Sequence, residues 1–274
     1  MDADIKNKLS EKAANVRKGI IEATYSAKSG HPGGSLSCAD ILAYLYFKEM
    51  DIDPADPSKP GRDRLVLSKG HAAPALYSVL AERGFFPAED LKTLRKSTSY
   101  LQGHPNMNYV QGVDMSTGSL GQGISAAVGM ALGGKIKNAP FRVYAILGDG
   151  EIEEGQVWEA AMFASAKKLD NLTVFVDNNN LQIDGAVDEV NSPYPIAEKW
   201  QAFGFNTLEI DGHDFDEIEN AVNAAKTHKN GPTAIIAKTV KGKGVSFMEN
   251  KVSWHGAAPN AEQYEQAMTE LMQK

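Results

Sequence analysis

From residue 141 onward the chain alternates short β-branched runs with helical segments. The runs are FRVYAIL (141–147), NLTVFVD (171–177), NTLEI (206–210) and TAIIAKT (233–239), with helical patterns between them. Strands that alternate with helices pair in parallel and need helices on both faces of the sheet. We therefore predict an α/β fold with a mostly parallel sheet covered on both faces, in a single domain spanning residues 1–274.

The first half of the chain is predicted to be mostly helical. Apolar residues recur at helical spacing over residues 5–28, until the Gly/Pro-rich segment SGHPGGS (29–35), which predicts a turn. A helix should resume over residues 36–50, and residues 64–84 predict a short buried strand, a turn and a helix. Gly/Ala-rich residues 119–137 and the C-terminal residues 260–274 each predict a further helix.

Composition excludes several classes of protein. The net charge of −7 is spread without long acidic or basic runs, which argues against a nucleic-acid surface. Cys38 is the one cysteine and cannot form an internal disulfide, which fits a reducing compartment. No segment approaches the roughly 20 apolar residues of a membrane helix, and the N-terminus lacks the apolar core of a signal peptide. We expect a cytoplasmic protein that binds neither nucleic acid nor membrane.

Two polar clusters follow neighbouring predicted strands. Gly148, Asp149 and Gly150 come directly after the strand at 141–147, and residues 178–180 are asparagines that follow the strand at 171–177. Parallel strands bring such turns to the same edge of the sheet, where ligands bind. Carboxylate and amide oxygens suit Mg²⁺ that shares its coordination with phosphates. Either cluster alone would be interpreted as a turn or a cap, but together they predict a metal-bridged diphosphate site.

The resemblance to a known family rests on a set of ordered motifs. They are SGHPGG, LSKGHAAPALY, GHPN, STGSLGQG, GDGEIEEGQVWEA, DNNNLQIDG and WHG. With these motifs the chain resembles the thiamine-diphosphate enzyme superfamily, whose signature is GDG followed, a helix and a strand later, by NN. More narrowly it resembles transketolase, over residues 16–256.

The resemblance implies roles for the matching positions. Mg²⁺, with Ca²⁺ and Mn²⁺ as alternatives, would be bound by the Asp149 carboxylate, the Asn179 side chain and the main-chain carbonyl of Leu181. Ser119 stands where many members of the family have proline, which alters the stiffness of the loop beside Leu120. The other residues implied in binding thiamine diphosphate are His71, His255, Gly118, Leu120, Gly148, Gly150 and Glu154, the last at a subunit interface.

Three histidines are the predicted catalytic residues. By resemblance, His31 and His104 would face hydroxyl and carbonyl oxygens of the substrate, and His255 would act beside the diphosphate. Most of the six histidines lie in glycine-flanked turns, which independently favours a polar cleft. Lys243, in the loop before His255, is a candidate for contact with the cofactor. His213 is predicted to be an N-terminal turn residue of the following helix.

The resemblance also implies that one catalytic group lies elsewhere. In transketolase the glutamate that contacts the cofactor's pyrimidine belongs to a second, pyrimidine-binding domain, and nothing after residue 259 resembles that domain. We therefore expect the N-terminal subunit of a split transketolase, which transfers a two-carbon ketol unit between sugar phosphates. It should be inactive alone and pair with a separate C-terminal subunit in an α2β2 heterotetramer.

Several alternatives stay open at this point. The enzyme could be a transketolase specialised for an unusual sugar phosphate, or a subunit resembling 1-deoxyxylulose-phosphate synthase or a dehydrogenase E1 component. The motifs SGHPGG, GHPN and VSWHG favour transketolase among these. A non-catalytic cofactor-binding module is the alternative from another class, and the polar residues of the predicted cleft argue against it. The sequence does not identify the sugar.

Overall fold

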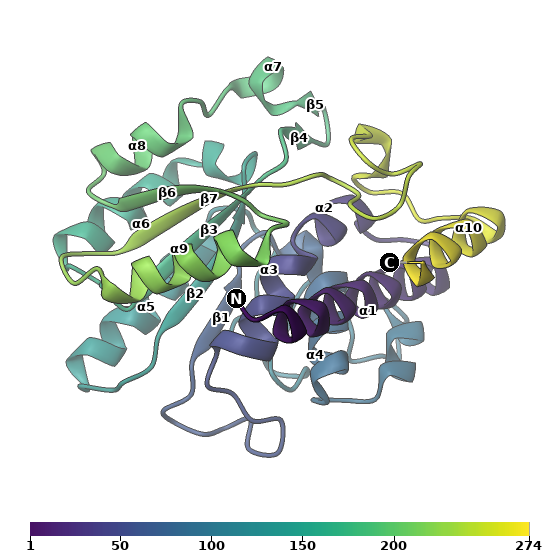
Figure 1. Ribbon diagram of the computed structural model, residues 1–274, viewed down its shortest axis with the longest axis horizontal. Coiled ribbons are helices and arrows are strands. Elements are labelled where there is room, and N and C mark those ends of the chain that lie inside the picture. Colours follow the sequence, from purple (N-terminus) through teal and green to yellow (C-terminus); the bar gives the residue numbers. More distant parts are fainter. Residues whose placement is uncertain (274) are drawn as a thin grey trace.

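A computed structural model describes residues 1–273 and contains one large sheet. Its five strands have the order β1-β2-β3-β7-β6, and every neighbouring pair is parallel (Figure 1). The predicted mostly parallel α/β sheet is therefore confirmed. The strands are β1 (Arg64–Leu67), β2 (Val143–Gly148), β3 (Leu172–Asn178), β6 (Asn206–Asp211) and β7 (Thr233–Lys238).

The apolar runs form strands because both faces of the sheet are covered. Along β2, Tyr144 and Ile146 pack into one hydrophobic cluster, whereas Val143, Ala145 and Leu147 pack into a second on the opposite face. All five side chains are fully buried. Successive strand residues point to opposite faces, so a central strand between two helical layers must be apolar throughout.

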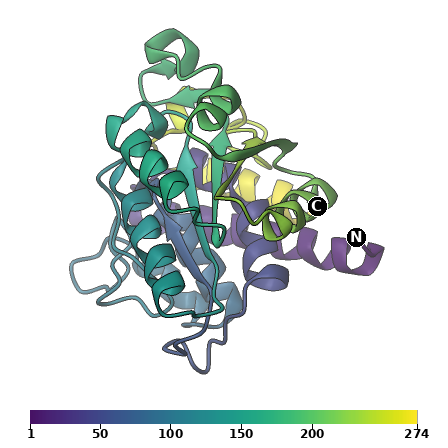
Figure 2. The ribbon, with the colours of Figure 1, turned by 90° about the vertical axis from the view of Figure 1, so that its left-hand side faces the viewer.

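Two layers of helices cover the sheet, as the side view in Figure 2 shows. The helices on one face, whose residues share a cluster with Tyr144, are α1 (Ala3–Ala27), α3 (Ala39–Tyr44), α4 (Ala73–Arg83), α9 (Phe215–Thr227) and α10 (Ala261–Met272). The helices on the other face are α5 (Gln122–Ile136), α6 (Gly155–Ala166) and α8 (Ile196–Ala202). None of the helices within residues 1–273 has the length and apolar character needed to cross a bilayer.

Shorter elements complete the fold. A two-stranded antiparallel hairpin and the helix after it were not predicted from the sequence; they are β4 (Leu181–Gln182), β5 (Gly185–Ala186) and α7 (Val187–Asn191). The remaining short helical segments are α2 (Pro32–Ser37), η1 (Leu45–Glu49), η2 (Gly70–Ala72), η3 (Ala88–Thr93), η4 (Glu151–Glu153) and η5 (Val252–Trp254).

The predicted turn at residues 29–35 is partly wrong. Helix α2 begins inside it, at Pro32, and the helix expected over residues 36–50 is interrupted at Cys38. Pro is well suited to a first helical position, and burial of the whole of α2 offsets the low helix propensity of its two glycines. A Cβ on Gly33 would lie 2.7 Å from the backbone oxygen of Trp254, so close packing explains glycine there.

Candidate active site

A cavity of about 370 Å³ lies at the carboxyl edge of the sheet. The turns after β1, β2, β3 and β7 all contribute to it, which is where open parallel sheets bind their ligands. His31, His104 and Lys243 of the predicted site residues do not line it directly. The predicted residues that do are His71, Gly118, Leu120, Gly148, Asp149, Gly150, Glu154, Asn179, Leu181 and His255.

Asp149 is a buried carboxylate whose hydrogen bonds within residues 1–273 come from backbone groups. Its side-chain oxygens accept hydrogen bonds from the N–H groups of Gly150 (2.9 Å) and Asn180 (2.5 Å), and the residue is 2% exposed. Burial, and then the nearby Asp177 carboxylate, raise the pKa of Asp149 to about 7. Within residues 1–273 no Lys, Arg or His side chain donates a hydrogen bond to it. A divalent cation would fit this site because it would stabilise the ionised form.

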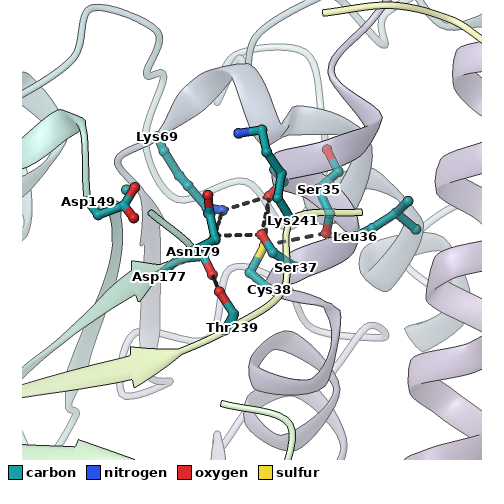
Figure 3. Close-up of polar contacts among 12 residues, drawn as sticks. Ser35, Leu36, Ser37, Cys38, Lys69, Asp149, Asp177, Asn179, Thr239 and Lys241 are labelled. Atoms are coloured by element: carbon teal, nitrogen blue, oxygen red, sulfur yellow. Dashed lines mark hydrogen bonds and ion pairs between the residues drawn. The ribbon is translucent and has the colours of Figure 1, made fainter. Parts of the chain in front are cut away.

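Asn179 is held in one orientation by Asp177. Its Nδ2 donates to Asp177 Oδ2 (3.1 Å), and its Oδ1 accepts from the Leu181 N–H (3.2 Å). A carboxylate can only accept here, so the amide cannot turn over without losing both bonds. Figure 3 shows Asp149 with its carboxyl turned toward Asn179, each on its own strand end. The two residues therefore present oxygen atoms to the same cavity.

Asp177 is fully buried and forms the centre of a polar cluster (Figure 3). It accepts hydrogen bonds from Lys69 Nζ (2.5 Å), Ser37 Oγ (2.6 Å) and Thr239 Oγ1 (2.5 Å) as well as from Asn179. Burial alone would raise the pKa of Asp177. The Lys69 ammonium and the hydroxyl donors outweigh burial and hold this pKa below its ordinary value. Asp177 is thus an ionised acceptor that links the turns after β1, β3 and β7.

Lys241, rather than the predicted Lys243, contributes the ammonium from the segment after β7. Lys241 is 2% exposed, lines the cavity, and donates from Nζ to the carbonyl oxygen of Leu181 (2.9 Å). Burial and the neighbouring Lys69 lower the pKa of Lys241 to about 8. Lys243 instead lines a separate hollow beside Glu209 and Lys238. The alternation of lysine and glycine in this segment could not indicate which lysine turns inward.

Three histidines form a cluster at the cavity. The ring centroids of His31, His71 and His255 lie 5.2–5.5 Å apart in each pair. His104 lies behind Gly118, where a Cβ would come within 2.9 Å of the imidazole. Gly118 has φ of +151°, a conformation that favours glycine. The structure thus brings His31 and His255 together, with His104 separated from the cavity wall by Gly118.

All four of these imidazoles are neutral at physiological pH. Burial, followed by nearby cations, lowers the pKa of His31 to about 4 and of His255 to about 3. The pKa values of His71 and His104 are lowered as well, again chiefly by burial. The Nδ1 atoms of His31 and His255 are buried without a hydrogen-bond partner among the described residues. They are therefore available to polar atoms of a ligand, as uncharged donors or acceptors.

The lowered pKa values predict a pH-dependent stability. Because folded His255 titrates below the ordinary histidine pKa, its contribution to stability is complete above pH 6.5 and is lost as the pH falls toward 3. Between pH 7 and pH 5 the wild type should lose about 1–2 kcal/mol more unfolding free energy than His255→Gln does, the lower end allowing for solvent screening of this half-buried ring. Urea unfolding of both proteins at the two pH values measures the difference, and equal losses would contradict the buried neutral imidazole.

Glu151 was not predicted, although it holds the loop that carries Asp149. One carboxylate oxygen accepts from Ser68 Oγ (2.5 Å) and the Gly121 N–H (3.0 Å), and the other accepts from the Gly148 N–H (3.1 Å). Glu151 is 2% exposed, so these bonds are shielded from water. They tie the turn after β2 to the turn after β1 and to the start of α5.

Two further cations near the histidines were also missed. Lys69 donates to the carbonyl oxygen of Gly34 (2.6 Å) and to Asp177, and it lines the cavity. Arg95 donates from Nη1 to Ser29 Oγ (2.9 Å), and its charge contributes to the lowered pKa of His31. Both look like ordinary surface cations in the sequence. Only the fold shows that Lys69 and Arg95 place positive charge near the neutral histidines.

Glu154 lies at the rim of the cavity. It is exposed, it precedes helix α6, and its Cβ lies against Gly121, where an added Cβ would come within 2.8 Å. Its predicted position at a subunit interface stays a prediction.

The comparisons with known proteins agree on one family. A model described as transketolase, thiamine diphosphate binding domain, matches residues 9–273. The 6-deoxy-6-sulfo-D-fructose transketolase subunit SqwG of Clostridium sp. (strain MSTE9) is 49% identical over 263 residues, covering 96% of each chain. One of the subunits of the apulose-4-phosphate transketolase of Phocaeicola vulgatus is 43% identical, covering 94% of this chain and 92% of its own. The structure of transketolase from Leishmania mexicana matches with a TM-score of 0.91 at 30% identity, covering 96% of this chain but 41% of that chain.

Proposed function

Because this chain belongs to the transketolase family, we propose that it is the N-terminal, thiamine-diphosphate-binding subunit of a two-subunit transketolase. The enzyme would transfer a two-carbon ketol unit between sugar phosphates. The observation that carries the proposal is the cavity shared by Asp149, Asn179 and Leu181, with the buried ammonium groups of Lys69 and Lys241 in its wall. We propose that residues 1–274 form one domain, which the family match over 9–273 supports.

The donor atoms in the cavity fit a divalent ion and a diphosphate. Asp149 oxygens, Asn179 Oδ1 and the Leu181 carbonyl would ligate Mg²⁺, with Ca²⁺ or Mn²⁺ as alternatives. The raised pKa of Asp149 and the lack of a side-chain donor to it among the described residues support a cation there. Lys241 and the backbone at Gly148 would face the negative charge of the diphosphate.

The histidines would bind and orient the sugar. When bound, thiamine diphosphate supplies the reactive carbon that carries the two-carbon unit. His31, His104 and His255 would donate and accept hydrogen bonds at substrate hydroxyl and carbonyl oxygens. Their lowered pKa values support this role, because neutral imidazoles can do both at neutral pH. Arg95, whose charge acts on His31 and His104, would add positive charge on the substrate's side.

We propose that a separate C-terminal subunit completes the site in an α2β2 assembly. Two relatives of nearly the same length are named as subunits of transketolases, which supports a split enzyme. Exposed apolar side chains on α5 and α6 support an oligomer, since Ile136, Met162 and Phe163 are 72%, 60% and 44% exposed. The partner would supply the acid that contacts the pyrimidine ring. The single cysteine supports a cytoplasmic location for this assembly.

The named relatives favour a specialised sugar. One belongs to a transketolase for 6-deoxy-6-sulfo-D-fructose and the other to one for apulose 4-phosphate, and both match this chain over nearly their whole length. We propose a substrate of that kind, a ketose or ketose phosphate of unusual structure. A screen of donors and acceptors, with standard pentulose phosphates included, identifies which sugar the assembled enzyme prefers.

The purified chain alone is expected to show no ketol transfer with thiamine diphosphate and Mg²⁺. Adding its proposed C-terminal partner subunit should restore transfer, raising the rate by at least ~10³-fold. Coupled assays with and without the second subunit measure this, and the Asp149→Asn chain with the same partner is the matched control. Full activity of the chain alone would refute the split-enzyme proposal.

A further inference from the structure

His213 lies outside the cavity but contacts the segment that carries Lys241. It occupies the turn just before α9 rather than the first turn of that helix, and its N–H donates to Asp211 Oδ1 (2.8 Å). Its ring bridges two other elements. Nδ1 lies 2.7 Å from Asp40 Oδ2 on α3, and Nε2 lies 2.9 Å from the backbone nitrogen of Val240.

The two partners fix the tautomer of His213. A backbone N–H can only donate, so Nε2 must accept from Val240 and Nδ1 must carry the proton that it donates to Asp40. Asp40 is an ionised acceptor, because it also accepts from both Nη atoms of Arg17 on α1. Burial alone would raise the pKa of Asp40, yet Arg17 and His213 hold it at about 2. Arg17, Asp40 and His213 thus form a chain that ends at Val240.

Val240 is where the backbone leaves the sheet. The Thr239 N–H still continues the ladder, donating to the carbonyl of Asn178 (3.1 Å), whereas the next N–H donates to His213. Lys241 is the next residue in the chain. Its own carbonyl accepts from the Asn250 N–H (2.9 Å), and its Nζ reaches the Leu181 carbonyl in the cavity. His213 therefore fixes the backbone on the N-terminal side of the lysine.

We propose that His213 is a positioning residue, which holds the backbone at Val240 so that the Lys241 ammonium is presented to the diphosphate group of the cofactor. This inference rests on the proposed function of the cavity. A purely structural role for His213 predicts something different. Replacing His213 would then lower the stability of the chain, but it would not change the affinity of the folded protein for diphosphate, whether Lys241 is present or replaced.

Two substitutions separate the bonds of the ring. His213→Asn puts an amide near the position of Nδ1, so it keeps the Asp40 contact and loses the one to Val240. His213→Gln extends an amide oxygen to the position of Nε2 and can accept from Val240. Thiamine diphosphate with Mg²⁺ is the probe, titrated calorimetrically into the full chain, alone and with its partner subunit, below the melting temperature of each variant.

His213→Asn is expected to weaken binding of thiamine diphosphate roughly 10-fold, the size of effect seen for outer-shell partners of a site, while His213→Gln stays within about 3-fold of wild type. In a Lys241→Met background, His213→Asn should change the affinity less than 2-fold, because it acts through that lysine. An unchanged affinity for His213→Asn, or an equal loss in both backgrounds, would overturn the inference.

A measurement on the wild type keeps the test open if His213→Asn does not fold. The Val240 amide should be protected from hydrogen exchange in the cofactor-free chain, and free exchange there would also overturn the inference. The two proposals fail separately. If the wild type binds the cofactor and only the His213 variants behave otherwise than expected, the positioning role is wrong. If the wild type with its partner does not bind thiamine diphosphate, the function is wrong.

Discussion

Replacing Asp149 by asparagine is expected to abolish divalent-cation binding while making the cation-free chain more stable at neutral pH. The carboxylate is the one fully charged group among the three proposed metal ligands, the others being the Asn179 amide and the Leu181 carbonyl. Its loss should weaken Mg²⁺-dependent binding of thiamine diphosphate by more than ~100-fold, beyond the effect typical of outer-shell partners. Ketol transfer by the assembled enzyme should fall with it.

The gain in stability follows from the raised pKa of Asp149. Between its ordinary value of 3.8 and about 7, the folded chain holds a proton that the unfolded chain has released. The unfolding free energy of the cation-free wild type should therefore fall as the pH rises through that window, and the deficit should persist above it. The asparagine side chain carries no charge, so the Asp149→Asn variant should lack this fall.

Thermal unfolding at pH 5 and pH 8 checks both halves of the prediction. Without ligand, the melting temperature of Asp149→Asn should fall less between the two pH values than that of the wild type. With Mg²⁺ and thiamine diphosphate at pH 8, only the wild type should gain stability. Asp184→Asn, an exposed change of the same charge in the neighbouring hairpin, is the control and should behave as wild type. Retained Mg²⁺-dependent cofactor binding by Asp149→Asn would contradict the metal assignment.

The sequence could predict the strands and the shared edge because these depend on local patterns. A buried parallel strand is apolar throughout, and the Gly and Asn clusters at 148–150 and 178–180 are unfavourable in regular structure, so both stand out. Asp149 and Asn179 accordingly face one cavity, as predicted. The hairpin β4–β5 has no such pattern, being only two residues on each strand, and was not foreseen.

The groups that were missed depend on contacts between distant parts of the chain. In the sequence Asp177 is simply a polar residue at the end of the predicted strand 171–177, until its partner Lys69, far away in sequence, is seen beside it. For the same reason the sequence did not show that Lys241 lines the cavity, whereas the candidate Lys243 lines a separate hollow. The direction of each lysine is set by the turn after β7, which the contacts of Gly242 with Gly33 and of Val240 with His213 fix. No local propensity encodes either contact.

Lys69→Met should be among the most destabilising single substitutions in this chain. Lys69 and Asp177 are 1% and 0% exposed, and their ion pair measures 2.5 Å. Methionine would fill most of the space of lysine but leave Asp177 ionised and buried without its cation. Removing one partner of such a pair costs about 3–5 kcal/mol. Urea unfolding measures the loss, with the exposed Lys251→Met as the control of identical chemistry.

Removing both charges should separate stability from binding. In Lys69→Met/Asp177→Asn no uncompensated charge is buried, so most of the lost unfolding free energy should return. The amide at position 177 can donate as well as accept, so it no longer forces Asn179 to present Oδ1 to the cavity. The Lys69 ammonium is also lost from the cavity wall. Affinity for Mg²⁺ with thiamine diphosphate should therefore stay ~10–100-fold below wild type in a stably folded chain. If calorimetry finds wild-type affinity in that double variant, the carboxylate of Asp177 stabilises the fold without orienting Asn179.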